Sequence, residues 1–170
     1  MKKFLIVFFV VFAANLGCKK LDEGDRLCGC SPVVEPPITL VIKGTNGIDM
    51  LNPATNGYFA VNNIKMYYQS GGTEKQVSFG LSQPFSYGAG STLKFEYYQL
   101  LSTELLTLAS STNPPNLYLK LGNGEPLQLK VTMASGQKYK VEKLLVNNVE
   151  AAAAESPLKD MRPNIFYINL

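Results

Sequence analysis

Residues 117–133, LYLKLGNGEPLQLKVTM, decide the fold class of this chain. Leucine, valine and methionine occupy every second position on both sides of a central segment, residues 122–126. Strict alternation of this kind is typical of strands with one buried and one solvated face. The glycines and the asparagine between the two runs favour a reversal of the chain. The sequence therefore predicts a β-hairpin at this point.

The same alternation recurs along most of the chain outside this hairpin. It predicts further strands at residues 38–43, 64–68, 77–79, 93–98, 138–142 and 165–170. Residues 103–108, TELLTL, fit either a short helix or a strand, and we expect a strand. Residues 151–155, an alanine run stopped by a proline two residues later, are expected to form one helical turn.

The number and spacing of these segments indicate an all-β fold. Eight or nine short strands, separated by turns, predict a single antiparallel β-sandwich of the immunoglobulin-like class over residues 37–170. A small β-barrel satisfies the same alternation and is the alternative.

Composition excludes several classes of function. The chain has 170 residues, enough for one domain, and a formal net charge of +3, too small to indicate a nucleic-acid partner. It contains no histidine, which rules out Ser-His and Cys-His catalysis and removes the commonest metal ligand. No catalytic residue, cofactor or metal site is predicted, and a hydrolase that uses a pair of carboxylates is a third-ranked hypothesis.

Oxygen-bearing side chains cluster in one loop, where Asp49 lies close to Asn46, Asn52 and Asn56. A calcium loop needs such ligands, but it usually has more than one charged ligand. Asparagine and aspartate are also common turn residues, because their side chains accept hydrogen bonds from nearby backbone amides. Turn formation is therefore the preferred interpretation.

The chain begins with features of an export signal. Lys2 and Lys3 precede an apolar run, residues 4–14, which is too short to span a bilayer as a helix and is typical of a secretory signal peptide. The run ends at residues 15–18, Asn-Leu-Gly-Cys. A plain signal peptide that leaves Cys18 as a free thiol is one interpretation.

The small residue before Cys18 resembles a bacterial lipobox, and the whole N-terminal segment is similar to that of small Bacteroidetes-type lipoproteins. The resemblance implies removal of residues 1–17, acyl chains on Cys18 that anchor the protein to a membrane, and residence at the outer membrane, facing the periplasm or the exterior. Acidic residues soon after the cysteine, Asp22, Glu23 and Asp25, resemble an outer-membrane export signal.

Residues 18–36 have no periodic apolar pattern and are rich in charge and proline, which predicts a flexible tether. Cys28 and Cys30 form a C-x-C pair within it. A zinc site needs two further cysteine or histidine ligands, which the chain lacks once Cys18 is acylated. The pair is therefore interpreted as part of the linker, with a disulfide of some kind as the alternative.

Three tyrosines, Tyr67, Tyr98 and Tyr118, fall on the predicted polar faces of their strands, among lysines and a glutamate. Such residues serve as cross-strand pairs, as a contact face for a partner protein, or as a platform for sugar rings. The lack of tryptophan counts against a glycan platform. The leading hypothesis is a non-catalytic binding or accessory module that contacts an envelope protein. A glycan-binding accessory protein of an outer-membrane uptake system is the alternative.

Overall fold

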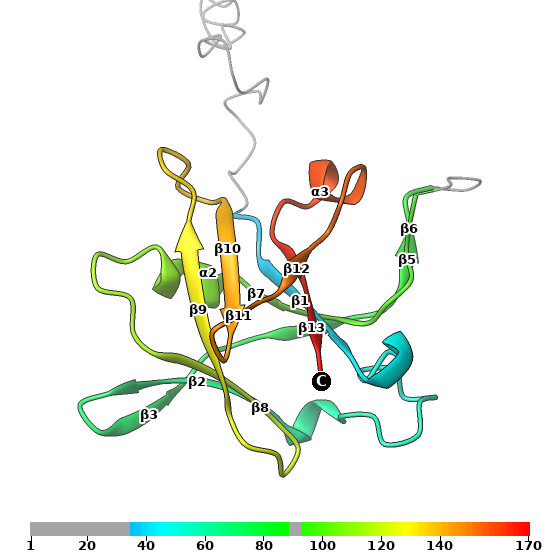
Figure 1. Ribbon diagram of the computed structural model, residues 1–170, viewed down its shortest axis with the longest axis horizontal. Coiled ribbons are helices and arrows are strands. Elements are labelled where there is room, and N and C mark those ends of the chain that lie inside the picture. Colours follow the sequence, from blue (N-terminus) through cyan, green and yellow to red (C-terminus); the bar gives the residue numbers. More distant parts are fainter. Residues whose placement is uncertain (1–34, 89–92) are drawn as a thin grey trace, which may run out of the picture. The chain divides into compact units, whose positions relative to one another are not determined.

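Two main sheets, A and B, dominate the computed structural model, which describes residues 35–88 and 93–170. They stack as a β-sandwich and do not close into a barrel (Figure 1). The prediction of a mostly β fold with two stacked sheets is confirmed. The barrel alternative is wrong, because no hydrogen-bonded ladder joins an edge of sheet A to an edge of sheet B within the described residues. The predictions for Cys18, the signal segment and the tether cysteines lie outside the described residues.

Sheet A has five strands. In spatial order they are β12 (Ala152–Ala153), β13 (Ile165–Asn169), β1 (Ile38–Lys43), β7 (Gln99–Ser102) and β4 (Gly80–Ser82). The C-terminal strand β13 lies inside the sheet and pairs in parallel with β1, so the sandwich is not wholly antiparallel as predicted. β1 and β13 come from the two ends of the domain, and strands that are not joined by a hairpin can pair in either direction, as β1 does with β13 and β7.

Sheet B has six strands, all antiparallel. In spatial order they are β11 (Val149–Glu150), β10 (Val141–Val146), β9 (Leu127–Met133), β8 (Leu117–Leu121), β2 (Ile64–Ser70) and β3 (Thr73–Gln76). Strands β8 and β9 form the hairpin expected from the sequence, with Leu117 opposite Leu129. That prediction is confirmed.

The remaining elements are short. They are the ladder of β5 (Phe85–Ser86) and β6 (Lys94–Phe95), the 3-10 turns η1 (Thr45–Gly47) and η2 (Val61–Asn63), and the helices α2 (Thr103–Ala109) and α3 (Leu158–Met161). The described residues thus form thirteen strands, against the eight or nine expected. The count is higher because the structure contains short strands, such as β3, β5, β11 and β12, at places where alternation predicted no strand. No described helix has the length and apolar character needed to cross a membrane.

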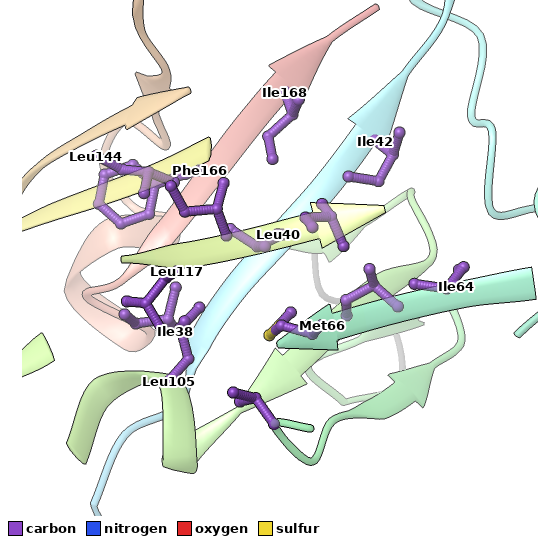
Figure 2. Packing of buried hydrophobic residues seen from close by; sticks show 14 of the residues in the cluster. Ile38, Leu40, Ile42, Ile64, Met66, Leu105, Leu117, Leu144, Phe166 and Ile168 are labelled. Atoms are coloured by element: carbon purple, nitrogen blue, oxygen red, sulfur yellow. The ribbon is translucent and has the colours of Figure 1, made fainter. Parts of the chain in front are cut away.

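The main core lies between the two sheets. Alternate residues of β1, β2 and β8 point into it, among them Ile38, Leu40, Ile64, Met66 and Leu117, all nearly or fully buried (Figure 2). Their burial supplies the main driving force for folding, at roughly 1.5–3 kcal/mol per fully buried large apolar side chain.

A second apolar cluster lies on the other face of sheet A. Val41 and Ile165, which point away from the main core, pack there with Phe95 of β6 and Ala154. Side chains from β5 and α3 pack against the same cluster. Sheet A is therefore apolar on both faces. The outer face of sheet B is the sheet surface that carries alternate polar residues, as expected for a sheet with one side in water.

Residues 103–108 form most of helix α2, so the expectation of a strand there is wrong. Ser102 caps this helix, since its hydroxyl oxygen accepts a hydrogen bond of 3.0 Å from the Leu105 amide. Leu105, Leu106 and Ala109 are buried along one side. The capping hydroxyl and this spacing favour a helix over the strand suggested by the leucines alone.

Three other local predictions are also corrected. The alanine run contains strand β12, which pairs with β13 and leaves no helical turn. Residues 77–79 form no strand, because the chain passes there from sheet B to sheet A. Of residues 93–98, only Lys94–Phe95 are in a strand, and that strand pairs with β5 outside both main sheets.

Candidate ligand face on sheet B

The outer face of sheet B carries a row of four aligned side chains. Tyr67 on β2 lies opposite Tyr118 on β8. Gln76 on β3 lies opposite Tyr67, and Gln128 on β9 lies opposite Tyr118. Four adjacent strands thus contribute one residue each, in the spatial order Gln76, Tyr67, Tyr118, Gln128. We refer to these residues as the tyrosine row.

The two tyrosines of the row stack on each other. Their ring centroids are 5.3 Å apart and their planes differ by 20°. Tyr67 is only 7% exposed, whereas Tyr118 is half-buried. Burial, followed by the negative charge of Glu74 and the neighbouring Tyr118, raises the pKa of Tyr67. A ligand on this face would therefore find its aromatic contact at Tyr118.

Lysines flank the tyrosine row on both sides. Lys65 on β2 lies directly opposite Lys120 on β8, and Lys130 follows Gln128 on the same face of β9. Within residues 35–88 and 93–170 the one salt bridge joins Lys143 to Glu150, with Nζ and Oε2 2.6 Å apart. In that part of the chain, the three flanking lysines have no carboxylate at ion-pair distance.

The third predicted tyrosine, Tyr98, lies elsewhere. It precedes β7, packs against the main core between the sheets, and its backbone N–H donates to Asp49 Oδ2 at 2.7 Å. The structure therefore brings Tyr67 and Tyr118 together and leaves Tyr98 out of the row. Phe95 and Tyr97 pack at the second cluster, whereas Tyr98 and Leu100 pack at the main core, so both sides of this segment are covered by apolar residues.

The loop around Asp49 uses its oxygens for turns. Besides the bond to Tyr98, Asp49 Oδ1 accepts from the Leu51 amide at 2.9 Å, and Asn52 Oδ1 accepts from the Ala54 amide at 2.9 Å. The bonds of Asp49 Oδ1 and Asn52 Oδ1 to amides two residues on agree with the predicted turns, and Asp49 Oδ2 ties the loop to the segment before β7. The described residues contain no group of three or more acidic, cysteine or histidine side chains placed to hold a metal ion.

The aromatic residues on the outer face of sheet A are covered by the chain's own cations. Lys43 Nζ lies 4.2 Å from the ring centres of both Tyr97 and Tyr167, and Arg162 lies over the Phe85 ring at 4.6 Å. Burial is the main cause of a raised pKa at Tyr167, and the neighbouring Tyr97 raises it further. Cation–π contacts of this kind stabilise the face and leave less of its rings for a ligand.

A pocket of about 290 Å³ adjoins the tyrosine row, between β9 and the segment that leads into β8. Two prolines, Pro114 and Pro115, line it. Its polar lining residues are Asn116, Gln128, Lys130 and Asn148. Apolar residues that include Leu117 and Val131 complete its lining. We refer to this pocket as the polar hollow. Gln128 belongs to both the hollow and the row. Alternation along single strands gives no signal for this pocket, because its residues come from separate segments of the chain.

A second pocket, of about 300 Å³, lies where β10 and β11 meet the end of β13. Its lining is more apolar and includes Leu127, Val146 and Ile168. Two exposed apolar residues, Val149 and Leu170, also line it. No lysine lines it, and its polar residues are Asn147, Asn169, Glu150 and Tyr167.

Comparison with known proteins identifies no relative of this chain. No protein-family model, curated protein or solved structure matches it. Its function is therefore argued from its own residues.

Proposed function

We propose that this protein is a lipid-anchored, non-catalytic binding module of the cell envelope, whose ligand face is the outer face of sheet B. The observation that carries the proposal is the stacked pair of Tyr67 and Tyr118, flanked by Lys65, Lys120 and Lys130, which are free of ion pairs in the described part of the chain. Two stacked sheets of short strands support an immunoglobulin-like sandwich as the scaffold.

The lysines favour a ligand that is polar and anionic. Like charges placed directly opposite each other on adjacent strands destabilise a sheet, and Lys65 and Lys120 form such a pair. An anion bound between or beside them would replace this repulsion with attraction. Local features that weaken a fold without an internal compensation are typical of functional sites.

A glycan fits this face better than the hydrophobic patch of a protein partner. Side-chain amides at both ends of the tyrosine row can donate to and accept from sugar hydroxyls. The large apolar side chains that are exposed in the described residues, such as Ile48, Leu81 and Met161, belong to neither the row nor its lysines. Protein interfaces instead depend on buried apolar and aromatic anchors at their centre. An acidic protein partner is the competing hypothesis.

The anchor is proposed from the N-terminal sequence. The basic start, the apolar run of residues 4–14 and the lipobox-like segment before Cys18 support acylation of that cysteine and a tether over residues 18–36. Two or three acyl chains hold a protein stably at a membrane, whereas one does so marginally. Residence at the outer membrane, facing the periplasm or the exterior, is part of the proposal.

The test uses the full-length protein, extracted from membranes in detergent, on a panel of envelope and plant glycans. Tyr118→Ala and the double variant Lys65→Gln/Lys120→Gln are compared with the wild type and with Tyr58→Ala, which changes an exposed tyrosine outside the sheets. We expect both ligand-face variants to lose binding and the control variant to keep it. Equal binding by all four proteins would overturn the assignment of the face.

A further inference from the structure

The polar hollow contains the side-chain chemistry of a sugar subsite. Asn116, Gln128 and Asn148 line it, and their side-chain amides can both donate and accept hydrogen bonds, as sugar hydroxyls do. Lys130 also lines it and has a cation that only donates. No hydrogen bond or ion pair with any described residue occupies these four side chains. All four are therefore available to a ligand.

The size and the remaining walls of the hollow suit a single ring. Its volume of about 290 Å³ lies at the lower end of the range for small-molecule sites. Pro114 and Pro115 contribute rigid apolar surface next to the amides. A sugar ring needs such surface for its C–H groups while its hydroxyls bond to polar side chains.

The backbone holds the hollow in shape before any ligand binds. Asn147 is bonded twice to the backbone of Gln128, since its N–H donates to the Gln128 carbonyl at 2.9 Å and its Oδ1 accepts from the Gln128 amide at 2.8 Å. Asn147 and Asn148 both have positive φ angles, 49° and 65°, which asparagine tolerates better than most residues. The turn that carries Asn148 is thus fixed against β9. Such preorganisation lowers the entropy lost on binding.

The charge of the hollow selects an acidic ligand. Lys130 is the one charged side chain that lines it, and no carboxylate lines it. We infer that the polar hollow binds a carboxylate-bearing sugar residue of a glycan chain, with Lys130 paired to the carboxylate and Asn116, Gln128 and Asn148 bonded to hydroxyls. This inference rests on the proposed function and names the class of its ligand.

The placement of the hollow defines the path of the glycan. Gln128 lies opposite Tyr118, so a residue bound in the hollow has its neighbour in the chain over the exposed side of Tyr118. Lys120 lies on the same face of β8, two residues further along. A polymer with a carboxylate on each residue would pair with both lysines. The hollow would bind one residue, and the tyrosine row would support the next.

The experiment is calorimetric titration of the full-length protein in detergent with oligogalacturonate, its fully methyl-esterified form, sulfated dextran and poly-glutamate. We expect oligogalacturonate to bind at least about tenfold more tightly than the neutral ester, because a charge-assisted bond to Lys130 is lost on esterification. Lys130→Gln should reduce this preference, with the remainder due to Lys120, and leave binding of the ester unchanged. Lys94→Gln, an exposed lysine on β6, is the matched control.

Gln128→Ala is the second variant, and the melting temperature of each variant verifies that it is folded. Binding of oligogalacturonate that is unaffected by both Lys130→Gln and Gln128→Ala would overturn the inference. Tighter binding of sulfated dextran or poly-glutamate, lost in Lys65→Gln/Lys120→Gln, would also overturn it while leaving the ligand face of the proposed function intact. Absence of binding to every probe would overturn both.

Discussion

Lys65 lies directly opposite Lys120 in the antiparallel pair of β2 and β8, beside the stacked rings of Tyr67 and Tyr118. Two ammonium groups at opposing positions repel each other, and no described carboxylate forms an ion pair with either. The arrangement is unfavourable for the sheet taken alone. It is favourable for a surface that binds an anion, and it has measurable consequences.

Removing one charge of this pair should stabilise the fold. We expect Lys65→Gln to raise the free energy of unfolding by about 0.2–1 kcal/mol at low salt, the size of a cross-strand charge effect. The gain should shrink at high salt, because screening already weakens the repulsion in the wild type. Urea denaturation at two salt concentrations measures both effects, with Lys94→Gln as control. A loss of stability in Lys65→Gln would show that this lysine has a structural partner.

The two stacked tyrosines should differ in their contribution to stability. Tyr67 is almost fully buried and Tyr118 is only half-buried, so Tyr67→Ala creates the larger loss of packing. We expect Tyr67→Ala to cost about 3 kcal/mol, within the range for large buried aromatics, and Tyr118→Ala clearly less. Chemical denaturation of both variants measures the difference. Equal losses would contradict the asymmetry between the two rings.

Stability at acid pH should depend on Glu104. The Ser78 hydroxyl and the Ser78 amide both donate to Glu104 Oε2, at 2.6 and 2.7 Å, and these bonds lower the pKa of the Glu104 carboxyl in the folded protein. A lowered pKa means that the unfolded chain binds more protons below about pH 4.5. The stabilisation is therefore complete above the unfolded pKa and is lost as the pH falls through the folded pKa.

The variant Glu104→Gln tests whether protonation of Glu104 contributes to the loss of stability at acid pH. The variant should be less stable than the wild type at neutral pH, and the difference should narrow as the pH falls from about 5 towards 3. Melting temperatures across this range measure it, and Glu142→Gln, an exposed residue of β10, is the matched control. If the melting temperatures of the wild type and Glu104→Gln differed by the same amount at every pH, the charge of the Glu104 carboxylate would not contribute to stability.

The lipid anchor leads to a prediction on Cys18. Mass spectrometry of the membrane-extracted protein should find an N-terminal Cys18 that carries acyl chains. Cys18→Ser should move the protein from the membrane to the soluble fraction, because acyl chains supply the affinity for the bilayer. Cys28→Ser is the control and should stay membrane-bound. A Cys18→Ser protein that remained with the membrane would contradict the proposed lipid anchor at Cys18.

The sequence predicted the local elements of the fold better than its non-local ones. The β8–β9 hairpin followed from strict alternation around a glycine-rich turn, which needs no other part of the chain. Helix α2 was missed because TELLTL fits two periodicities, and the capping hydroxyl of Ser102 decided between them. The alanine run was assigned to a helix from propensity, but β12 forms there because it pairs with β13.

The candidate site could be predicted only in part for the same reason. That Tyr67 and Tyr118 lie on polar faces follows from alternation within each strand. Their stacking depends on the register of β2 against β8, which alternation does not specify. Tyr98 was misplaced because the side of the segment opposite Phe95 and Tyr97 packs against the main core instead of facing water. The polar hollow combines Asn116 and Asn148, which only the sheet order brings together.

Nuclear magnetic resonance of the full-length protein in detergent micelles, titrated with oligogalacturonate, would show directly which face of the domain binds the ligand. If the outer face of sheet B is the ligand face, the largest shifts of backbone amides will fall on β2, β8 and β9, around Tyr118, Gln128 and Lys130. Shifts centred instead on Lys43, Tyr97 and Tyr167 of sheet A, or no shifts at saturating ligand, would contradict it.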